Sequence, residues 1–194
     1  MKVFPTTAIV ASALLASTAS AKSICSAIQP YTYTNAAKQY PELQPVVDAM
    51  KGNAIASWYT DRQADQMGDL LNQCKDSIPS IVIYGLPDKD CGDGGFSQGG
   101  ANKNADMYKA WIQKLVDQVG TREVIYVFEP DAIGLVAANG CGVQKGYLAN
   151  MKMALGLLAS NPNAHIYADV ASWADQAGAI KALNDLKSAG NLKG

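Results

Sequence analysis

The sequence lacks an excess of charge of either sign. Among 194 residues there are 16 lysines and arginines against 17 aspartates and glutamates, so the formal net charge is −1. There is no basic stripe or cluster, so nucleic acids and anionic membranes are not expected as partners. Low charge together with nine tyrosines and three tryptophans fits a neutral polar ligand such as a carbohydrate.

Long apolar runs are also missing, apart from a short one near the N-terminus. Lys2, the apolar residues 8–15 and the small residues Ala19-Ser20-Ala21 follow the pattern of a secretory signal peptide over residues 1–21. The run is too short to span a bilayer, so we predict a secreted, extracellular protein that does not insert into a membrane. Residues 22–194 then form one domain, which we expect to be a monomer.

Cysteine and histidine are few. The four cysteines of an exported chain predict two disulfides, for which three pairings are possible. We favour Cys25–Cys74 and Cys91–Cys141, because each pair joins neighbouring segments. No Cys-x-x-Cys or Cys/His spacing occurs, so we expect neither a zinc site nor a cofactor. The single histidine, His165, lies within a predicted strand and is interpreted as a packed or surface residue.

The sequence does contain an alternation of strand and helix patterns. Short apolar runs with little polar alternation predict strands covered on both faces at residues 53–58, 80–84, 123–128 and 164–169. Apolar residues at helical spacing predict helices at residues 61–77, 105–119, 146–159 and 177–189. This order predicts an α/β fold of parallel βα units with right-handed crossovers. A closed barrel needs about eight such units, so the chain looks incomplete, with a further strand expected after the last helix.

Acidic residues follow two of these strands. The second strand leads into Gly85-Leu86-Pro87-Asp88-Lys89-Asp90-Cys91, and the third leads into Glu129-Pro130-Asp131. The carboxyl ends of parallel strands form the floor of an active site, so two carboxyl groups there suggest acid–base chemistry on a sugar bond. Two neighbouring carboxylates do not both ionise easily, so one pKa rises and that group can serve as a general acid.

Each of these residues also has an interpretation without chemistry. Without chemistry, Asp131 is interpreted as the N-cap of the helical turn 132–138, a position that aspartate favours. Asp90 is interpreted as a solvated turn residue. Glu129 would form a buried ion pair with a lysine or arginine, and Pro130 would hold it in extended geometry. The glycine-rich segment 91–104 predicts a mobile surface loop, which is either a cover for an active site or a flexible connector.

Taken together, the two strand ends resemble glycoside hydrolase family 6, the secreted cellulases and cellobiohydrolases. The family pattern is Tyr-x-Leu-Pro-x-Arg-Asp-Cys, then a strand that ends in Glu-Pro-Asp. The corresponding segments here read IVIYGLPDKDC and VIYVFEPDAIG, and AIASWYTDR is similar to the family's first strand. The resemblance covers roughly residues 50–175 and implies inverting hydrolysis of β-1,4-glucan in a distorted α/β barrel, of which this chain holds about the first half.

The resemblance also implies roles for single residues. Asp131 matches the general acid, and Asp90 matches the aspartate that raises the pKa of that acid and stabilises the transition state. Tyr84 matches the tyrosine that distorts the bound sugar. The remaining residues matched to substrate binding are Trp58, Asp169 and Trp173. Outside the family context, each tryptophan is more readily a core residue. The bridge Cys91–Cys141 matches the family's first disulfide.

The sequence departs from the family pattern at three places. Lys89 replaces the arginine, Gly85 replaces an aspartate, and the segment from Asp169 to Trp173 is shorter and lacks a histidine. These departures leave a second hypothesis, a catalytically inactive carbohydrate-binding or effector-like remnant of the family. An unrelated small α/β hydrolase ranks last, because the sequence has no nucleophile elbow of the Gly-x-Ser-x-Gly kind.

Overall fold

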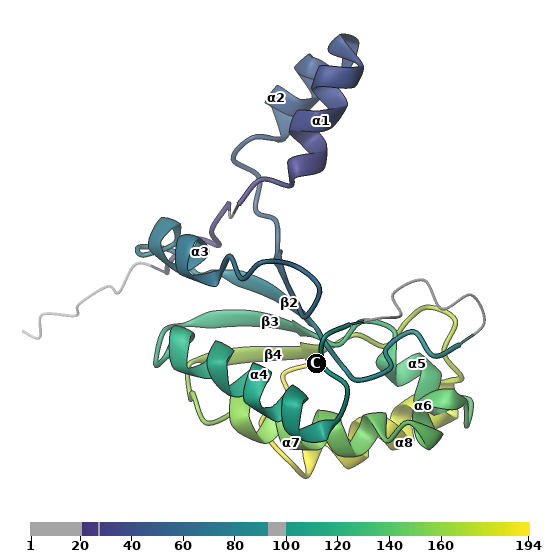
Figure 1. Cartoon of the computed structure of the whole chain (residues 1–194). Coiled ribbons are helices and arrows are strands. Elements are labelled where there is room, and N and C mark those ends of the chain that lie inside the picture. The colour runs from purple at the N-terminus through teal and green to yellow at the C-terminus, as the bar shows by residue number, and fades with distance from the viewer. Residues whose placement is uncertain (1–20, 27, 93–99) are drawn as a thin grey trace, which may run out of the picture.

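A four-stranded parallel sheet forms the centre of the protein (Figure 1). The computed structural model describes residues 21–26, 28–92 and 100–194. The predicted signal peptide, apart from Ala21, and residues 93–99 of the glycine-rich segment therefore lie outside the described residues. The strand order is β1-β2-β3-β4, and the strands are β1 Ser57–Thr60, β2 Ser80–Tyr84, β3 Val124–Phe128 and β4 Ala164–Ala168. This open parallel sheet confirms the predicted α/β fold and its partial-barrel character.

Helices cover one face of the sheet. They are α3 Met67–Gln73, α4 Ala105–Val119, α5 Ala132–Ala137, α6 Cys141–Gln144, α7 Tyr147–Leu158 and α8 Gln176–Lys187. Figure 1 shows α4 and α7 side by side beneath the sheet, where alternate strand residues such as Ile83, Phe128 and Ile166 are completely buried. On the opposite face Trp58 is 54% exposed and Tyr167 is 44% exposed. The expectation that both faces are covered is therefore wrong for the described residues.

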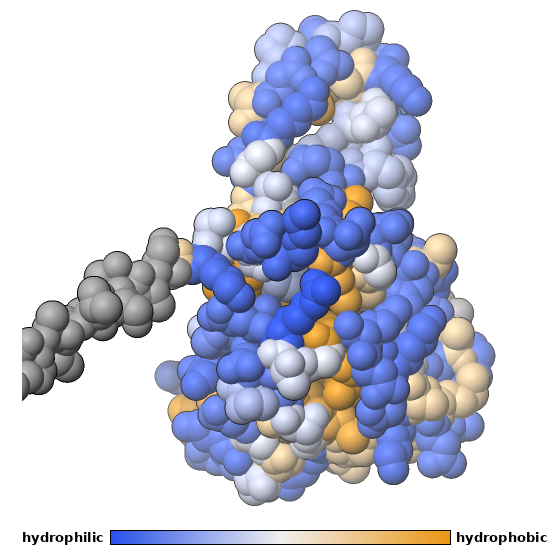
Figure 2. All heavy atoms as spheres, turned by 90° about the vertical axis from the view of Figure 1, so that its left-hand side faces the viewer, coloured by the Kyte–Doolittle hydropathy of each residue, from blue (hydrophilic) through white to orange (hydrophobic). Residues whose placement is uncertain are grey.

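A band of hydrophobic residues reaches the surface on the side that lies to the left in Figure 1. Figure 2 shows this band flanked by hydrophilic residues on both sides. The strands of Figure 1 point away from this side, so their amino ends face it and their carboxyl ends lie on the opposite side of the body. Among the described residues, no helix is long and apolar enough to cross a membrane.

Local sequence signals explain where most helices begin and end. Helix α4 has the predicted bounds, because the side chain of Asn104 accepts a hydrogen bond from the Met107 N–H (3.0 Å) and Gly120 ends the helix with φ +60°. Helix α3 is shorter than predicted, because Asp65 accepts from the Met67 N–H (2.9 Å) and starts the helix late. Strand β1 lies later than predicted, since its pairing with β2 runs from Ser57 to Thr60.

An N-terminal helical hairpin was not predicted. It comprises α1 Tyr31–Gln39, the 3₁₀ turn η1 Pro41–Leu43 and α2 Gln44–Met50, and it projects away from the sheet (Figure 1). Pro41 and Pro45 interrupt the apolar pattern of this segment, yet both occupy the first turn of an element, where proline is tolerated. None of its residues is buried, so little tertiary packing supports it.

Two further features of the chain follow the sequence expectations. Both predicted disulfides are present, Cys25–Cys74 with a Cα–Cα distance of 5.6 Å and Cys91–Cys141 with 5.9 Å. After α8 the chain returns to the sheet, where Leu192 forms a parallel bridge with Ile166. The Lys193 N–H donates to the Ile166 carbonyl at 2.8 Å, so strand-like pairing continues beside β4.

Candidate active site at the carboxyl ends of the strands

Three aspartates from three strand ends meet at one edge of the sheet. Asp90 lies in the loop after β2, Asp131 follows β3 and Asp169 follows β4. The backbone N–H of Asp131 donates to the Asp169 carboxylate at 3.2 Å. Burial raises the pKa of Asp131, and the charges of Asp169 and then Asp90 raise it further. The Asp131 carboxyl thus holds its proton more strongly than an ordinary aspartate, which is the direction that a general acid requires.

The side chain of Asp131 is turned toward Trp173. Asp131 occupies the N-cap position of α5, but its backbone is left-handed (φ +66°) and its side chain makes no capping hydrogen bond. A hydrogen bond from the Trp173 indole to the Asp131 carboxylate favours the ionised form and partly offsets the rise in pKa. The N-cap interpretation is therefore wrong, and the carboxyl group is available at the site edge.

Neither of the two predicted platform tryptophans is a core residue. Trp173 is 56% exposed, and its ring lies against Gly134, where a Cβ atom would come within 2.5 Å of it. Trp58 is 54% exposed and meets Tyr84 edge to face, with 5.5 Å between ring centroids. The Lys89 ammonium lies 5.5 Å from the centroid of the Tyr84 ring. Two exposed tryptophans therefore lie within β1 and beyond the end of β4, and the half-buried Tyr84 lies at the end of β2.

Strained backbone conformations gather at this edge. Six non-glycine residues have positive φ among the described residues, and five of them follow β2, β3 or β4: Asp88, Asp90, Glu129, Asp131 and Ala171. Such conformations cost on the order of 1–3 kcal/mol each and cluster at active sites. Glu129 has φ +46°, so the prediction that Pro130 holds it extended is wrong. The side-chain contacts of Glu129 outweigh the preference of a residue before proline for extended backbone.

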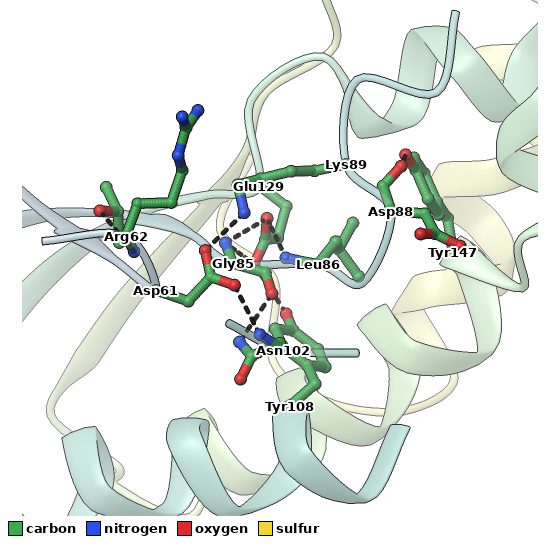
Figure 3. Close-up of polar contacts among 11 residues, drawn as sticks. Asp61, Arg62, Gly85, Leu86, Asp88, Lys89, Asn102, Tyr108, Glu129 and Tyr147 are labelled. Atoms are coloured by element: carbon green, nitrogen blue, oxygen red, sulfur yellow. Dashed lines mark hydrogen bonds and ion pairs between the residues drawn. The ribbon is translucent and has the colours of Figure 1, made fainter. Parts of the chain in front are cut away.

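Glu129 is buried, and Figure 3 shows its carboxyl group among the residues that bind it. It accepts hydrogen bonds from the Tyr108 hydroxyl (2.8 Å), the Gly85 N–H (3.0 and 3.1 Å to its two oxygens) and the Leu86 N–H (3.3 Å). Burial raises the pKa of Glu129 to about 7, against the opposing effects of these donors and of Lys89. The predicted ion pair of Glu129 is wrong, because Lys89 is paired elsewhere.

The partner of Lys89 is Asp61. The two charged groups are 2.5 Å apart, with side-chain exposures of 3% and 0%. Asp61 also accepts from the backbone N–H of Asn102 at 2.7 Å, and the Asn102 amide donates to the Gly85 carbonyl at 2.8 Å (Figure 3). Asn102 belongs to the predicted mobile segment 91–104, but it is buried and anchored. That prediction is therefore wrong for this end of the segment.

A second set of contacts holds the far end of the β2 loop. The Tyr147 hydroxyl donates to the Asp88 carbonyl and accepts from the Cys91 N–H at 3.4 Å. The disulfide from Cys91 to Cys141 joins this point to α6. Burial, as the largest cause, raises the pKa of Tyr147 to about 12, so its hydroxyl stays neutral. Asp90 therefore lies between two anchored points of the chain.

Several of these residues were not predicted as site residues. Tyr108 and Tyr147 lie in helical stripes that are typical of a core, and Asn102 lies in a glycine-rich segment. Asp61 could have been found from the sequence, because it is an acidic residue that follows a strand, as Asp90 and Asp131 are. His165 lies within β4 and faces Glu123 at 3.4 Å, outside the site. No group of three metal-ligating side chains occurs in the described part of the chain.

Sequence comparison places this arrangement in a known family. The family model of glycosyl hydrolases family 6 matches residues 13–193 of the chain. The chain belongs to glycosyl hydrolases family 6. Among relatives of this family, Endoglucanase A of Thermobispora bispora is 39% identical over 59 residues, which are 30% of this chain and 12% of that protein. Endoglucanase 1 of Streptomyces halstedii is 28% identical over 120 residues, covering 57% of this chain and 35% of that protein.

Solved family 6 structures share the fold. The endoglucanase Cel6 from Mycobacterium tuberculosis matches with a TM-score of 0.70 at 20% identity, covering 85% of this chain and 58% of that chain. Cellobiohydrolase II (Cel6A) from Humicola insolens matches with a TM-score of 0.68 at 21% identity, covering 87% of this chain and 58% of that chain. The family 6 chain described here thus spans little more than half the length of these structures.

Proposed function

We propose that this family 6 chain hydrolyses β-1,4-glucosidic bonds in cellulose or a related β-glucan with inversion at the anomeric carbon. The observation that carries the proposal is the Asp131 carboxyl, whose pKa is raised by burial and by the neighbouring charges of Asp169 and Asp90. The proposal is supported by membership of the family and by relatives named as endoglucanases. It does not require a metal or another cofactor.

In the proposed reaction Asp131 donates its proton to the glycosidic oxygen as the bond to the anomeric carbon breaks. Asp90 stabilises the positive charge that develops on the sugar ring. A water molecule attacks the anomeric carbon from the opposite face and releases one proton to the solvent, so the product has inverted configuration. Tyr84, Trp58 and Trp173 are proposed to contact the glucan, with Asp169 holding the Asp131 backbone.

The decisive experiment compares the wild-type chain with Asp131→Asn on a soluble β-1,4-glucan. We expect the wild type to release reducing sugar as the α anomer, which NMR detects in fresh product. The variant should lose turnover and still bind cello-oligosaccharides, since the amide has the shape of the acid but no proton to donate. A wild-type chain that releases no sugar would refute the proposal, and a β product would refute inversion.

The second candidate, an inactive carbohydrate-binding remnant of the family, is favoured by the environment of Gly85. A Cβ atom at this position would lie 2.4 Å from the Trp111 ring, so the aspartate of the family pattern does not fit here. Cello-oligosaccharide binding without release of sugar would support this candidate. We also propose that residues 22–194 act as a secreted monomer, which N-terminal sequencing and light scattering of the exported protein would test.

A further inference from the structure

A buried glutamate lies directly behind the proposed acid residues and has no part in the mechanism above. Glu129 is 1% exposed, so it does not touch a substrate. It precedes Asp131 by two positions on the β3 end, yet its carboxyl group reaches across to the start of the β2 loop. A single side chain therefore connects the two segments that carry Asp131 and Asp90.

The contact fixes the first peptide groups of the loop that carries Asp90. The Gly85 N–H is bound by both Glu129 oxygens and the Leu86 N–H by one of them, at 3.0 to 3.3 Å. The Gly85 carbonyl is bound by Asn102 at 2.8 Å, so this peptide is held on both sides. The Lys89 N–H in turn donates to the Leu86 carbonyl at 3.2 Å, which passes the constraint on to the residue before Asp90.

The groups around the Glu129 carboxyl suit an acceptor at this point. Tyr108 from α4 and two backbone N–H groups donate to it. Lys89 is the nearby positive charge, but it is ion-paired with Asp61. The hydroxyl of Tyr147 on α7 faces the same region and bonds the loop instead. Every hydrogen-bond partner of Glu129 is thus a donor. A glutamine at this position would still accept from the backbone N–H groups through its amide oxygen, and its NH₂ group would donate to the Tyr108 hydroxyl if that hydroxyl turns to accept.

We propose that Glu129 is a positioning residue, whose acceptor oxygens hold the β2 loop so that Asp90 stays close to Asp131. This inference rests on the proposed function for its catalytic meaning. The pKa of Asp131 is raised by burial, by Asp169 and by Asp90, and it is lowered by Trp173. When Asp90 moves away, its share of that rise is lost and the pKa of Asp131 falls.

The test compares three single variants of the full chain. Glu129→Met keeps the size of the side chain but removes both acceptors, Glu129→Gln keeps one acceptor, and Glu123→Gln is a matched control at the opposite end of β3. For Glu129→Met we expect kcat to fall by about tenfold or more with KM within about twofold, because a shift near 1 Å in a catalytic group has effects of this order. The alkaline limb of its pH profile should move to lower pH. Both Gln variants should keep the kcat and KM of the wild type.

A readout independent of activity separates this inference from the proposed function. NMR titration of the Asp131 carboxyl should give a lower pKa in Glu129→Met than in the wild type and in both Gln variants. In the wild-type chain itself, the amide protons of Gly85 and Leu86 should titrate together with Glu129, whose pKa is about 7. This second measurement needs no variant and holds even if Glu129→Met fails to fold.

The outcomes are distinguishable. If the wild type hydrolyses no glucan but the titrations behave as expected, the proposed function fails and the positioning role stands. If Glu129→Met folds with an unchanged Asp131 pKa and unchanged kcat, or if the Gly85 and Leu86 amides show no inflection, the positioning role is wrong. A Glu129→Gln variant that loses as much as Glu129→Met would show that charge, not the acceptor, is what the loop needs.

Discussion

Replacing Glu129 by glutamine should make the protein less sensitive to alkaline pH, because the native state holds this carboxyl against ionisation. Its pKa is raised from 4.5 to about 7, mainly by burial. Below pH 4.5 both the folded and the unfolded chain carry the proton, and above about pH 7 neither does. Between these values the unfolded chain has already released the proton that the folded chain retains. The free energy of unfolding therefore falls as pH rises through this window.

The expected size of the effect follows from the same shift. One pKa unit corresponds to about 1.4 kcal/mol, so the shift of Glu129 amounts to about 3 kcal/mol in total. The stability of Glu129→Gln, measured relative to the wild type, should thus rise by about 3 kcal/mol from pH 4.5 to pH 8. The slope should be about 1.4 kcal/mol per pH unit inside the window and close to zero outside it.

Urea unfolding followed by tryptophan fluorescence measures this difference with both disulfides oxidised. Because the two proteins share every other titrating group, subtracting their curves isolates the contribution of Glu129. The control Glu123→Gln changes a partly exposed carboxyl outside the site, so the change in its difference curve should be much smaller than that of Glu129→Gln. A flat curve for Glu129→Gln, or one that falls with pH, would show that the donors and Lys89 outweigh burial and would refute the reasoning.

Two further predictions concern the surroundings of the acid. Trp173→Phe removes the hydrogen bond that lowers the pKa of Asp131, so the alkaline limb of the pH profile of kcat should move to higher pH, and an unmoved limb would contradict this. Lys89→Met leaves Asp61 buried without its partner and should lower the free energy of unfolding by about 3–5 kcal/mol. Denaturant unfolding at neutral pH measures this loss. The double variant Lys89→Met/Asp61→Leu should recover part of it, because it removes the unpaired charge but also the acceptor of the Asn102 N–H.

The framework of the fold could be predicted from the sequence because its signals are local. The bounds of α4 follow from the apolar stripe together with the cap at Asn104 and the stop at Gly120. The strands follow from short apolar runs, and their parallel order follows from the alternation with helices. The same rule brought Asp90 and Asp131 to one edge, since both lie in the segments that follow strands β2 and β3.

The network behind the site could not be predicted in the same way, because its contacts join residues distant in sequence. Gly85 and Glu129 are 44 positions apart, and Lys89 and Asp61 are 28 apart. Nothing in the periodicity of α4 distinguishes Tyr108, which binds Glu129, from an ordinary core residue. The rule that a residue before proline is extended was overridden at Glu129 by its tertiary hydrogen bonds.

The strained backbone at the strand ends explains why a polar network lies behind the site. Positive φ angles occur at Asp88, Asp90, Glu129 and Asp131. Each such conformation costs on the order of 1–3 kcal/mol, which the surrounding structure must offset. An apolar core has no directional contacts with which to hold a peptide group in such a conformation, whereas Glu129, Asn102 and Tyr147 bind peptide groups of the β2 loop directly. The sequence departs from the family pattern at Gly85 and Lys89; Gly85 belongs to these contacts, and Lys89 is ion-paired with Asp61 beside them. The position of Asp90 relative to Asp131 is therefore determined behind the site, by polar residues that never meet a substrate.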